Sequence, residues 1–354
     1  MYVLGKDNQH FVPVFYGSRF TNEATNTFYT YDLRSKVYDS IHSPEDLLKK
    51  KKLYEPNRDK PTYIIENELS RYESKWGVMF NEILDLYDPR ERANCIVEYR
   101  HMLVEFCIFQ FYRTELGMRL LEYTVKSILD GVDLGNTIVT TEEIVKSKAE
   151  LVRRGIEFKN YITQDFVDYF RNNNYSPKIA LIDIIESFVL YYNTTFTVDN
   201  IEVFYGNGFW LSDVPTSIIM PSRNEVRFKV VLSPYLAIEL HSTLYEDANK
   251  RPNAVNVTWY NLVKYEDLLR IRTNFLLRAS NYIISITEFT ERDRQYIESV
   301  CGYAGGDNTV RDFGIKNSGI LRRRLNKKPK KGRKRHEDKG IKDYVRDNCV
   351  IEDY

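Results

Sequence analysis

A histidine near the start of the chain, His10, is a residue that could act as a general base. It follows a polar N-terminal segment and precedes the apolar pair Phe11-Val12. Imidazole is the side chain whose ordinary pKa lies closest to neutral pH, which suits it to accept a proton. The same position also suits a histidine that only makes hydrogen bonds within the fold, and the sequence leaves both interpretations open.

A second group of polar residues interrupts an apolar helical pattern. Gln110 lies within the segment FCIFQFYR, where burial is expected, and a buried amide without partners costs a few kcal/mol. Arg113 and Arg119 follow, and their planar guanidinium groups can bind a carboxylate or a phosphate. The pattern fits an internal Arg–Glu network or a helix cap, and it also fits an anion-binding site.

Ser212 and Asp213 form a third candidate group. They interrupt the apolar segment FWLSDVPT just before Pro215, where a strand is expected to end. Strand ends often carry ligand or catalytic contacts. Alternatively, Asp213 accepts backbone N–H groups in a local turn.

Metal and covalent chemistry are less well supported. Glu98-x-x-His101 has the helical spacing of a di-iron ligand pair, but no second such pair follows, so a structural histidine is expected. The four cysteines are far apart and form no CxxC pair. The sequence also lacks a P-loop, a GxSxG elbow, a GxGxxG turn and an HExxH motif. No metal site is predicted, and the cofactor is unknown, with a divalent metal ion compatible with the chemistry above.

The strongest charge feature is a basic arm, the segment 322–335. It contains ten basic residues and no acidic one, which leaves 41 basic against 50 acidic residues in the rest of the chain. Such an arm fits salt-dependent binding to nucleic acid or another polyanion, or a solubilising tail without a specific partner. The predicted contact residues are Arg322, Arg323, Arg324, Lys327, Lys328, Lys330, Lys331, Arg333, Lys334 and Arg335.

Composition limits the classes of protein. Apolar residues make up 43% and charged residues 29% of the 354 residues, as in ordinary globular proteins. No uninterrupted apolar stretch approaches the roughly 18–20 residues that span a bilayer, so no membrane partner is expected. The first residues lack the pattern of a secretory signal, and a cytoplasmic location follows as the expectation.

The elements that must position these residues indicate an α+β fold with a mainly helical body. Alternation with a turn signal near Ser35 predicts β-structure, with a hairpin, over residues 10–41, and a short helix is expected from Ser43. Helices are predicted over 62–87, 89–114, 114–129, 141–172 and 178–193. Four strands, forming an antiparallel sheet, are expected near 200–242, and a further helix over 256–284. Residues 1–300 are expected to form one domain, and 301–354 a flexible basic tail.

Several short sequence boxes together resemble a known family, domain of unknown function 4238, which is mostly bacterial. The first box is Gln9-His10-Phe11-Val12-Pro13 with the aromatic residues that follow it, and the second is Gln110-Phe111-Tyr112-Arg113-Thr114 with Arg119. A glutamate-bearing helix at 66–73, Leu211-Ser212-Asp213-Val214-Pro215, Val231-Leu232-Ser233-Pro234 and Asn261 extend the resemblance over about residues 8–287. Gly17-Ser18-Arg19 and Val214 depart from the family pattern, which has Leu-Arg and Asn at these places.

The resemblance brings no established activity, but it marks the polar positions to examine. It suggests a pocket that gathers His10, Arg113 and Asp213 as catalytic residues. Gln110, Arg119, Ser212 and Asn261 would bind the substrate. An acid, a base and an anion-binding group in one pocket would suit hydrolysis of a phosphodiester.

The leading functional hypothesis is therefore a nucleic-acid-directed, nuclease-like hydrolase that acts as a toxin or as a phage-defence component. The alternative is a non-catalytic nucleic-acid-binding or regulatory protein, in which the same polar residues only brace the core. The oligomeric state is left open by the sequence.

Overall fold

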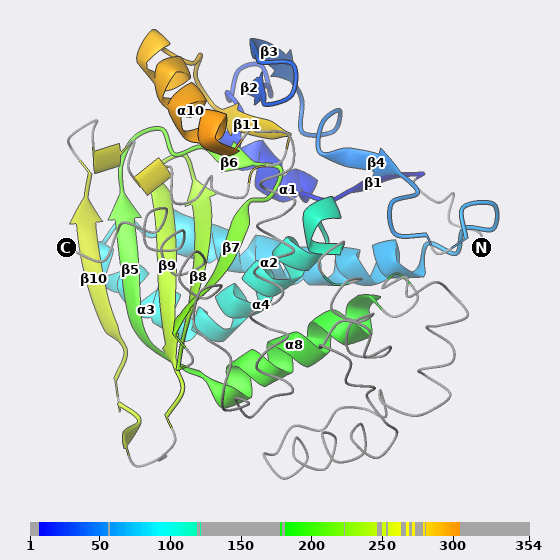
Figure 1. Cartoon of the computed structure of the whole chain (residues 1–354). Coiled ribbons are helices and arrows are strands. Elements are labelled where there is room, and N and C mark those ends of the chain that lie inside the picture. Colours follow the sequence, from blue (N-terminus) through cyan, green and yellow to red (C-terminus); the bar gives the residue numbers. More distant parts are fainter. Residues whose placement is uncertain are drawn as a thin grey trace, which may run out of the picture.

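A computed structural model of the chain describes residues 7–55, 57–118, 121, 178, 181–222, 224–245, 250–252, 254–262, 267–268, 271–272, 279 and 281–304. These residues form an α+β fold in which helices cover one face of a five-stranded sheet (Figure 1). Within them, no helix is both long and apolar enough to cross a membrane. The predicted helices over 114–129 and 141–172, Arg119 and the basic arm lie largely or wholly outside the described residues.

The five-stranded sheet has the order β10-β5-β9-β8-β7. Its strands are β5 (Thr197–Tyr205), β7 (Thr216–Ser222), β8 (Glu225–Ser233), β9 (Leu236–Thr243) and β10 (Asn256–Asn261). Neighbouring strands among β5, β7, β8 and β9 are antiparallel, as expected for residues 200–242, whereas β10 joins β5 in parallel. Val226, Phe228 and Leu240 point to the apolar core, and the residues between them therefore face the other way.

The helices on the core face are α2 (Ile64–Asp85), α3 (Pro89–Glu98), α4 (Arg100–Tyr112) and α8 (Leu181–Thr195). Helix α4 packs against α8, β7 and β8, and it is buried nearly all round, as its apolar sequence predicts. Aromatic rings fill the space between α2 and α4, where Trp76 and Phe80 meet Phe106 edge to face. The sheet and the helices therefore share one core.

The N-terminal region adds two small sheets (Figure 1). Strand β1 (Asn8–His10) pairs with β4 (Lys49–Lys51). The predicted hairpin is present as β2 (Phe28–Asp32) and β3 (Val37–His42), and it is extended by β11 (Tyr282–Ser285) and β6 (Leu211–Ser212). Helix α10 (Glu291–Ala304) packs beside this sheet through a small apolar cluster, and its C-terminal end extends four residues past the expected domain boundary at 300.

Two predictions for the N-terminal half are wrong. Residues 14–20 are helical rather than extended, with α1 (Val14–Gly17) and the 3-10 turn η1 (Ser18–Phe20), because Pro13 begins a helix whose first carbonyl accepts from Gly17. The segment from Ser43 is only a turn.

The expected single helix over 89–114 is divided at Tyr99, which ends α3 and begins α4.

The predicted helix over 256–284 is wrong at its two ends, which form the strands β10 and β11, whereas the described residues 267–268 and 271–272 between them are helical. The first of these, NVTWYN, is rich in residues that favour strands, and its alternation outweighs the helical pattern expected there. The apolar segment around Asp213 likewise divides into β6 and β7, which belong to different sheets.

Candidate functional site

Helix α4 binds the main chain of the N-terminal box. The Nε2 of Gln110 donates to the Phe11 carbonyl oxygen over 2.6 Å, and Nη2 of Arg113 donates to the His10 carbonyl oxygen over 2.6 Å. Gln110 and Arg113 are fully buried, as the sequence led us to expect for Gln110. Two boxes separated by about a hundred residues therefore meet, and their contact fixes the position of His10.

The guanidinium group of Arg113 has a protein partner at each nitrogen. Besides the His10 carbonyl, it donates through Nε to the Tyr54 hydroxyl over 3.2 Å and through Nη1 to the Glu73 carboxylate over 2.7 Å. Although burial lowers the pKa of Arg113, its contacts with Tyr54 and Glu73 outweigh that effect and raise the pKa above its usual value. Of the two roles expected for Arg113, the structure shows the internal Arg–Glu network and not the anion-binding site.

A second buried network holds the strand β1 from the other side. The Gln9 amide donates to Glu55 over 2.9 Å, and its oxygen accepts from the Tyr54 backbone N–H over 2.7 Å. Glu55 also accepts from the backbone N–H groups of Thr62 and Tyr63 just before α2. Because these bonds lie in the interior, where an unpaired group is costly, they fix β1 relative to the start of α2.

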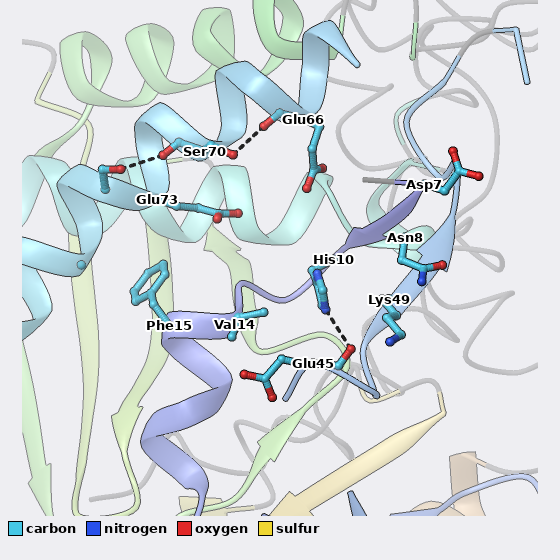
Figure 2. Close-up of a pocket in the computed structure, with 12 residues that line it drawn as sticks. Asp7, Asn8, His10, Val14, Phe15, Glu45, Lys49, Glu66, Ser70 and Glu73 are labelled. Atoms are coloured by element: carbon cyan, nitrogen blue, oxygen red, sulfur yellow. Dashed lines mark hydrogen bonds between the residues drawn. The ribbon is translucent and has the colours of Figure 1, made fainter. Parts of the chain in front are cut away.

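Beside this bracing lies a partly open cleft of about 800 Å³ between β1, β4, α1 and α2 (Figure 2). Most of its lining side chains are polar or charged. The lining residues are Asp7, Asn8, His10, Val14, Phe15, Glu45, Lys49, Glu66, Ser70, Glu73, Ser74 and Gly77.

His10 is the titratable base in this cleft. Its Nε2 lies 3.4 Å from the carbonyl oxygen of Glu45, so a proton on Nε2 leaves the lone pair of Nδ1 available to accept another. Burial lowers the pKa of His10, and the positive charges of Lys49 and Arg113 act in the same direction. The imidazole is therefore neutral at pH 7, which is the form that a general base requires.

One wall of the cleft is a single face of α2, which the sequence analysis did not assign to the site. Glu66, Ser70 and Glu73 follow one another at spacings of four and three residues, and Ser74 and Gly77 continue the same face. Figure 2 shows the first three along one side of the helix. The small residues Ser70, Ser74 and Gly77 on the same face as two glutamates could have indicated this wall, because small side chains leave room beside a helix.

The opposite wall is β4, which contributes three consecutive lysines. Alternation along the strand places Lys49 and Lys51 on one side and Lys50 on the other. Lys49 lines the cleft, Lys51 lies 3.6 Å from the cleft residue Asp7, and Lys50 binds Glu115. The cleft therefore combines a carboxylate wall with a basic edge.

Asp213, the third predicted catalytic residue, does not line this cleft. Its carboxylate accepts from the backbone and side-chain N–H groups of Asn281, over 3.0 and 2.7 Å, and from the backbone N–H of Tyr282. The pocket that was expected to gather His10, Arg113 and Asp213 is not formed, because Asp213 joins β6 to β11 in a network of its own.

The predicted substrate-binding residues are also distributed over several places. Ser212 forms a local turn in which its hydroxyl contacts the Val214 backbone, and Val214 is itself buried in the core. Asn261 is exposed at the end of β10, the edge strand of the large sheet. Among the members of this group that the structure describes, Gln110 alone contacts the segment that carries His10, through the Phe11 carbonyl oxygen.

A group of residues that could bind a metal ion lies outside the cleft. The predicted structural role of His101 agrees with its contact with Asn193 over 3.2 Å, and Glu98 belongs to a different helix. In the described residues, one set of three groups brings ligand atoms close enough for an ion: Glu202, Glu239 and His241, on the large sheet. None of the three lines the cleft.

The fold and the cleft define an α+β protein in which a helix-covered sheet carries a braced N-terminal segment. Residues 8–287 match the model of the family described as protein of unknown function, DUF4238, and the chain belongs to this family. No curated protein and no solved structure matches the chain. The match confirms the resemblance inferred from the sequence boxes.

Proposed function

We propose that the protein is a hydrolase that acts on phosphodiesters in nucleic acid, with the cleft at His10 as its active site. The observation that carries the proposal is the position of the His10 imidazole in a cleft between carboxylates and a lysine-bearing strand, where burial lowers its pKa and favours the neutral form. A neutral imidazole can activate water, and Lys49 can attract the negative charge of a phosphate. The carboxylates opposite it offer oxygen atoms of the kind that bind Mg²⁺.

In this proposal Arg113 is a positioning residue. Its guanidinium group holds the His10 carbonyl oxygen and the Glu73 carboxylate at the same time, so it sets the base relative to the glutamate wall. Asp213 has no part in the reaction. A role in toxicity or in phage defence remains a prediction from the sequence.

The test is cleavage of labelled single-stranded DNA, duplex DNA and RNA in the presence of Mg²⁺ or Mn²⁺. Replacing His10 with glutamine removes the base but leaves its main-chain bonds to Arg113 and Tyr54 in place. We expect cleavage to fall by about 10²–10⁴-fold, the usual contribution of a general base. His42→Gln is the matched control, since His42 lies on β3 and does not line the cleft.

Equal cleavage by His10→Gln and wild type, or no cleavage of any of the three substrates, would contradict the hydrolase.

A second candidate, a non-catalytic nucleic-acid-binding protein, is favoured by one observation. Arg113 and Asp213 were expected to be catalytic residues, but the polar atoms of both form hydrogen bonds to other residues of the protein. Binding would then depend on the basic arm, and deletion of residues 322–335 should weaken it and reduce its salt dependence. Unchanged affinity at low salt after this deletion would remove the arm from the interaction.

A further inference from the structure

The register of the large sheet brings three metal-ligating side chains to one place. Glu202 on β5 lies directly opposite Glu239 on β9, and His241 is two residues further along β9. All three therefore project from the same face. This face is directed away from α8, because Phe228, on the alternate face of the neighbouring strand, packs against Tyr192 of that helix.

The atoms of the three residues that could bind a metal ion face one another at separations longer than those of ordinary hydrogen bonds. Nε2 of His241 lies 3.5 Å from Oε1 of Glu239 and 3.6 Å from Oε2 of Glu202, and all three atoms lie within 4.8 Å of one another. Glu239 is only 5% exposed. Within the part of the chain that the structure describes, its Oε1 and the Nε2 of His241 are buried without a hydrogen-bond partner.

These separations match the spacing of ligands around a tetrahedral metal ion. Zinc binds nitrogen and oxygen at about 2.0–2.2 Å. At the tetrahedral angle, these bond lengths place two ligand atoms roughly 3.4 Å apart. The contacts of His241 with the two carboxylates, at 3.5 and 3.6 Å, are longer than hydrogen bonds and close to this value.

The remaining polar atom of each ligand is held by a different neighbour. Oε1 of Glu202 accepts from the Tyr260 hydroxyl over 3.4 Å. Oε2 of Glu239 binds Lys229 over 2.9 Å, and Nδ1 of His241 lies 3.6 Å from the Glu225 carboxylate. A histidine that presents Nε2 to a metal commonly has a carboxylate at Nδ1, which fixes its orientation.

The charges around the cluster also favour a cation. Glu202 and Glu239 are directly opposite each other across two central strands, an arrangement that costs free energy for like charges. Lys229 and Arg227 offset two of the three carboxylate charges at this place, counting Glu225.

We propose that Glu202, Glu239 and His241 bind a zinc ion, or a similar divalent transition metal, on the outer face of the large sheet. One imidazole and two carboxylates suit zinc or manganese better than calcium, which prefers oxygen ligands alone. Three protein ligands leave a fourth position for water or for an anionic group, with Arg227 nearby. The site shares no residue with the cleft at His10 and does not depend on the proposed hydrolase.

The test uses the full chain, freed of metal with a chelator and then titrated with ZnCl₂. Calorimetry and elemental analysis give the affinity and the number of ions bound, and Co²⁺ in place of Zn²⁺ reports the geometry through its absorbance. We expect Glu239→Gln and His241→Gln each to lose one bound ion or to bind it at least about 100-fold more weakly. Changes to residues that only orient a metal ligand weaken binding by up to about 100-fold, and loss of a ligand itself should cost at least as much. His101→Gln, which changes an exposed histidine outside the cluster, should bind like wild type.

Circular dichroism shows whether each variant is folded. If the substitutions on β9 prevent folding, Glu202→Gln, at a side chain 24% exposed, tests the same site with less disturbance of the interior. Wild-type stoichiometry and affinity in a folded Glu202→Gln or His241→Gln variant would overturn the proposal. So would a wild-type protein that binds no zinc, because the cluster would then be only a network of ion pairs and hydrogen bonds on the sheet.

Discussion

Replacing Arg113 with methionine tests whether this residue braces the cleft. Methionine fills a similar volume but removes the bonds to Glu73, Tyr54 and the His10 carbonyl oxygen. Breaking a buried ion pair usually costs about 3–5 kcal/mol. Here the Glu73 side chain is 26% exposed, so water can solvate it again, and Tyr54 still donates to the His10 carbonyl. We therefore expect a loss near the lower limit, about 3 kcal/mol.

The measurement is urea denaturation followed by tryptophan fluorescence, since Trp76 is fully buried next to the α4 core. An unchanged slope with denaturant would show that the variant unfolds from the same compact state. Arg71→Met is the matched control, because Arg71 forms an ion pair with Glu68 on the surface of α2 at a side chain 75% exposed. Such a pair contributes less than about 1 kcal/mol. A similarly small effect for Arg113→Met would refute the bracing role.

Three further predictions concern neighbouring contacts. Because burial lowers the pKa of His10, the unfolded chain binds its proton more readily, and stability should fall as the pH decreases below about 6.5 through the lower value of the folded state. His10→Gln should flatten that part of a pH series of urea midpoints, and an unchanged slope would contradict the assignment. Gln110→Leu should lower the free energy of unfolding by only about 1 kcal/mol in the same assay, because it removes the bond to Phe11 but also a buried Oε1 that has no hydrogen bond. Gln110→Glu should lower it more, because it buries a charge. Equal losses for the two variants would be inconsistent with this. Asp213→Asn should lower the free energy of unfolding by about 1–3 kcal/mol through its bonds to Asn281 and Tyr282, and thermal unfolding at wild-type temperature would exclude this role.

The fold was predictable where the apolar pattern was strong and local. Three elements are present as expected: the helix predicted over 62–87, the hairpin near Ser35 and the antiparallel strands after residue 200. The strand β10 was mistaken for helix although its own sequence favours a strand; among the described residues its partner is β5, which begins about sixty residues earlier, and no local signal reports such a pairing. A parallel neighbour of this kind depends on the tertiary fold rather than on propensity.

The candidate site was predictable only in part, for the same reason. The unusual position of Gln110 in an apolar helix correctly indicated a buried amide. The partner of Arg113 was not found, because Glu73 lies forty residues away on another helix and looks like an ordinary surface glutamate in the sequence. The trio at Glu202, Glu239 and His241 was equally hidden, since only the register of β5 and β9 brings it together.

Two boxes of the sequence resemblance, the N-terminal box and the box on α4, contact each other in the structure. Gln110 and Arg113 bind main-chain oxygen atoms of Phe11 and His10 rather than side chains. Such bonds fix the position of the backbone, and they could form with any side chain at residue 10. A need for stability alone would thus account for the glutamine and the arginine but not for an imidazole directed into a polar cleft. The chemical question for this protein is therefore concentrated in one side chain, and His10→Gln tests it while the bonds of Arg113 and Tyr54 to the main chain of residue 10 stay in place.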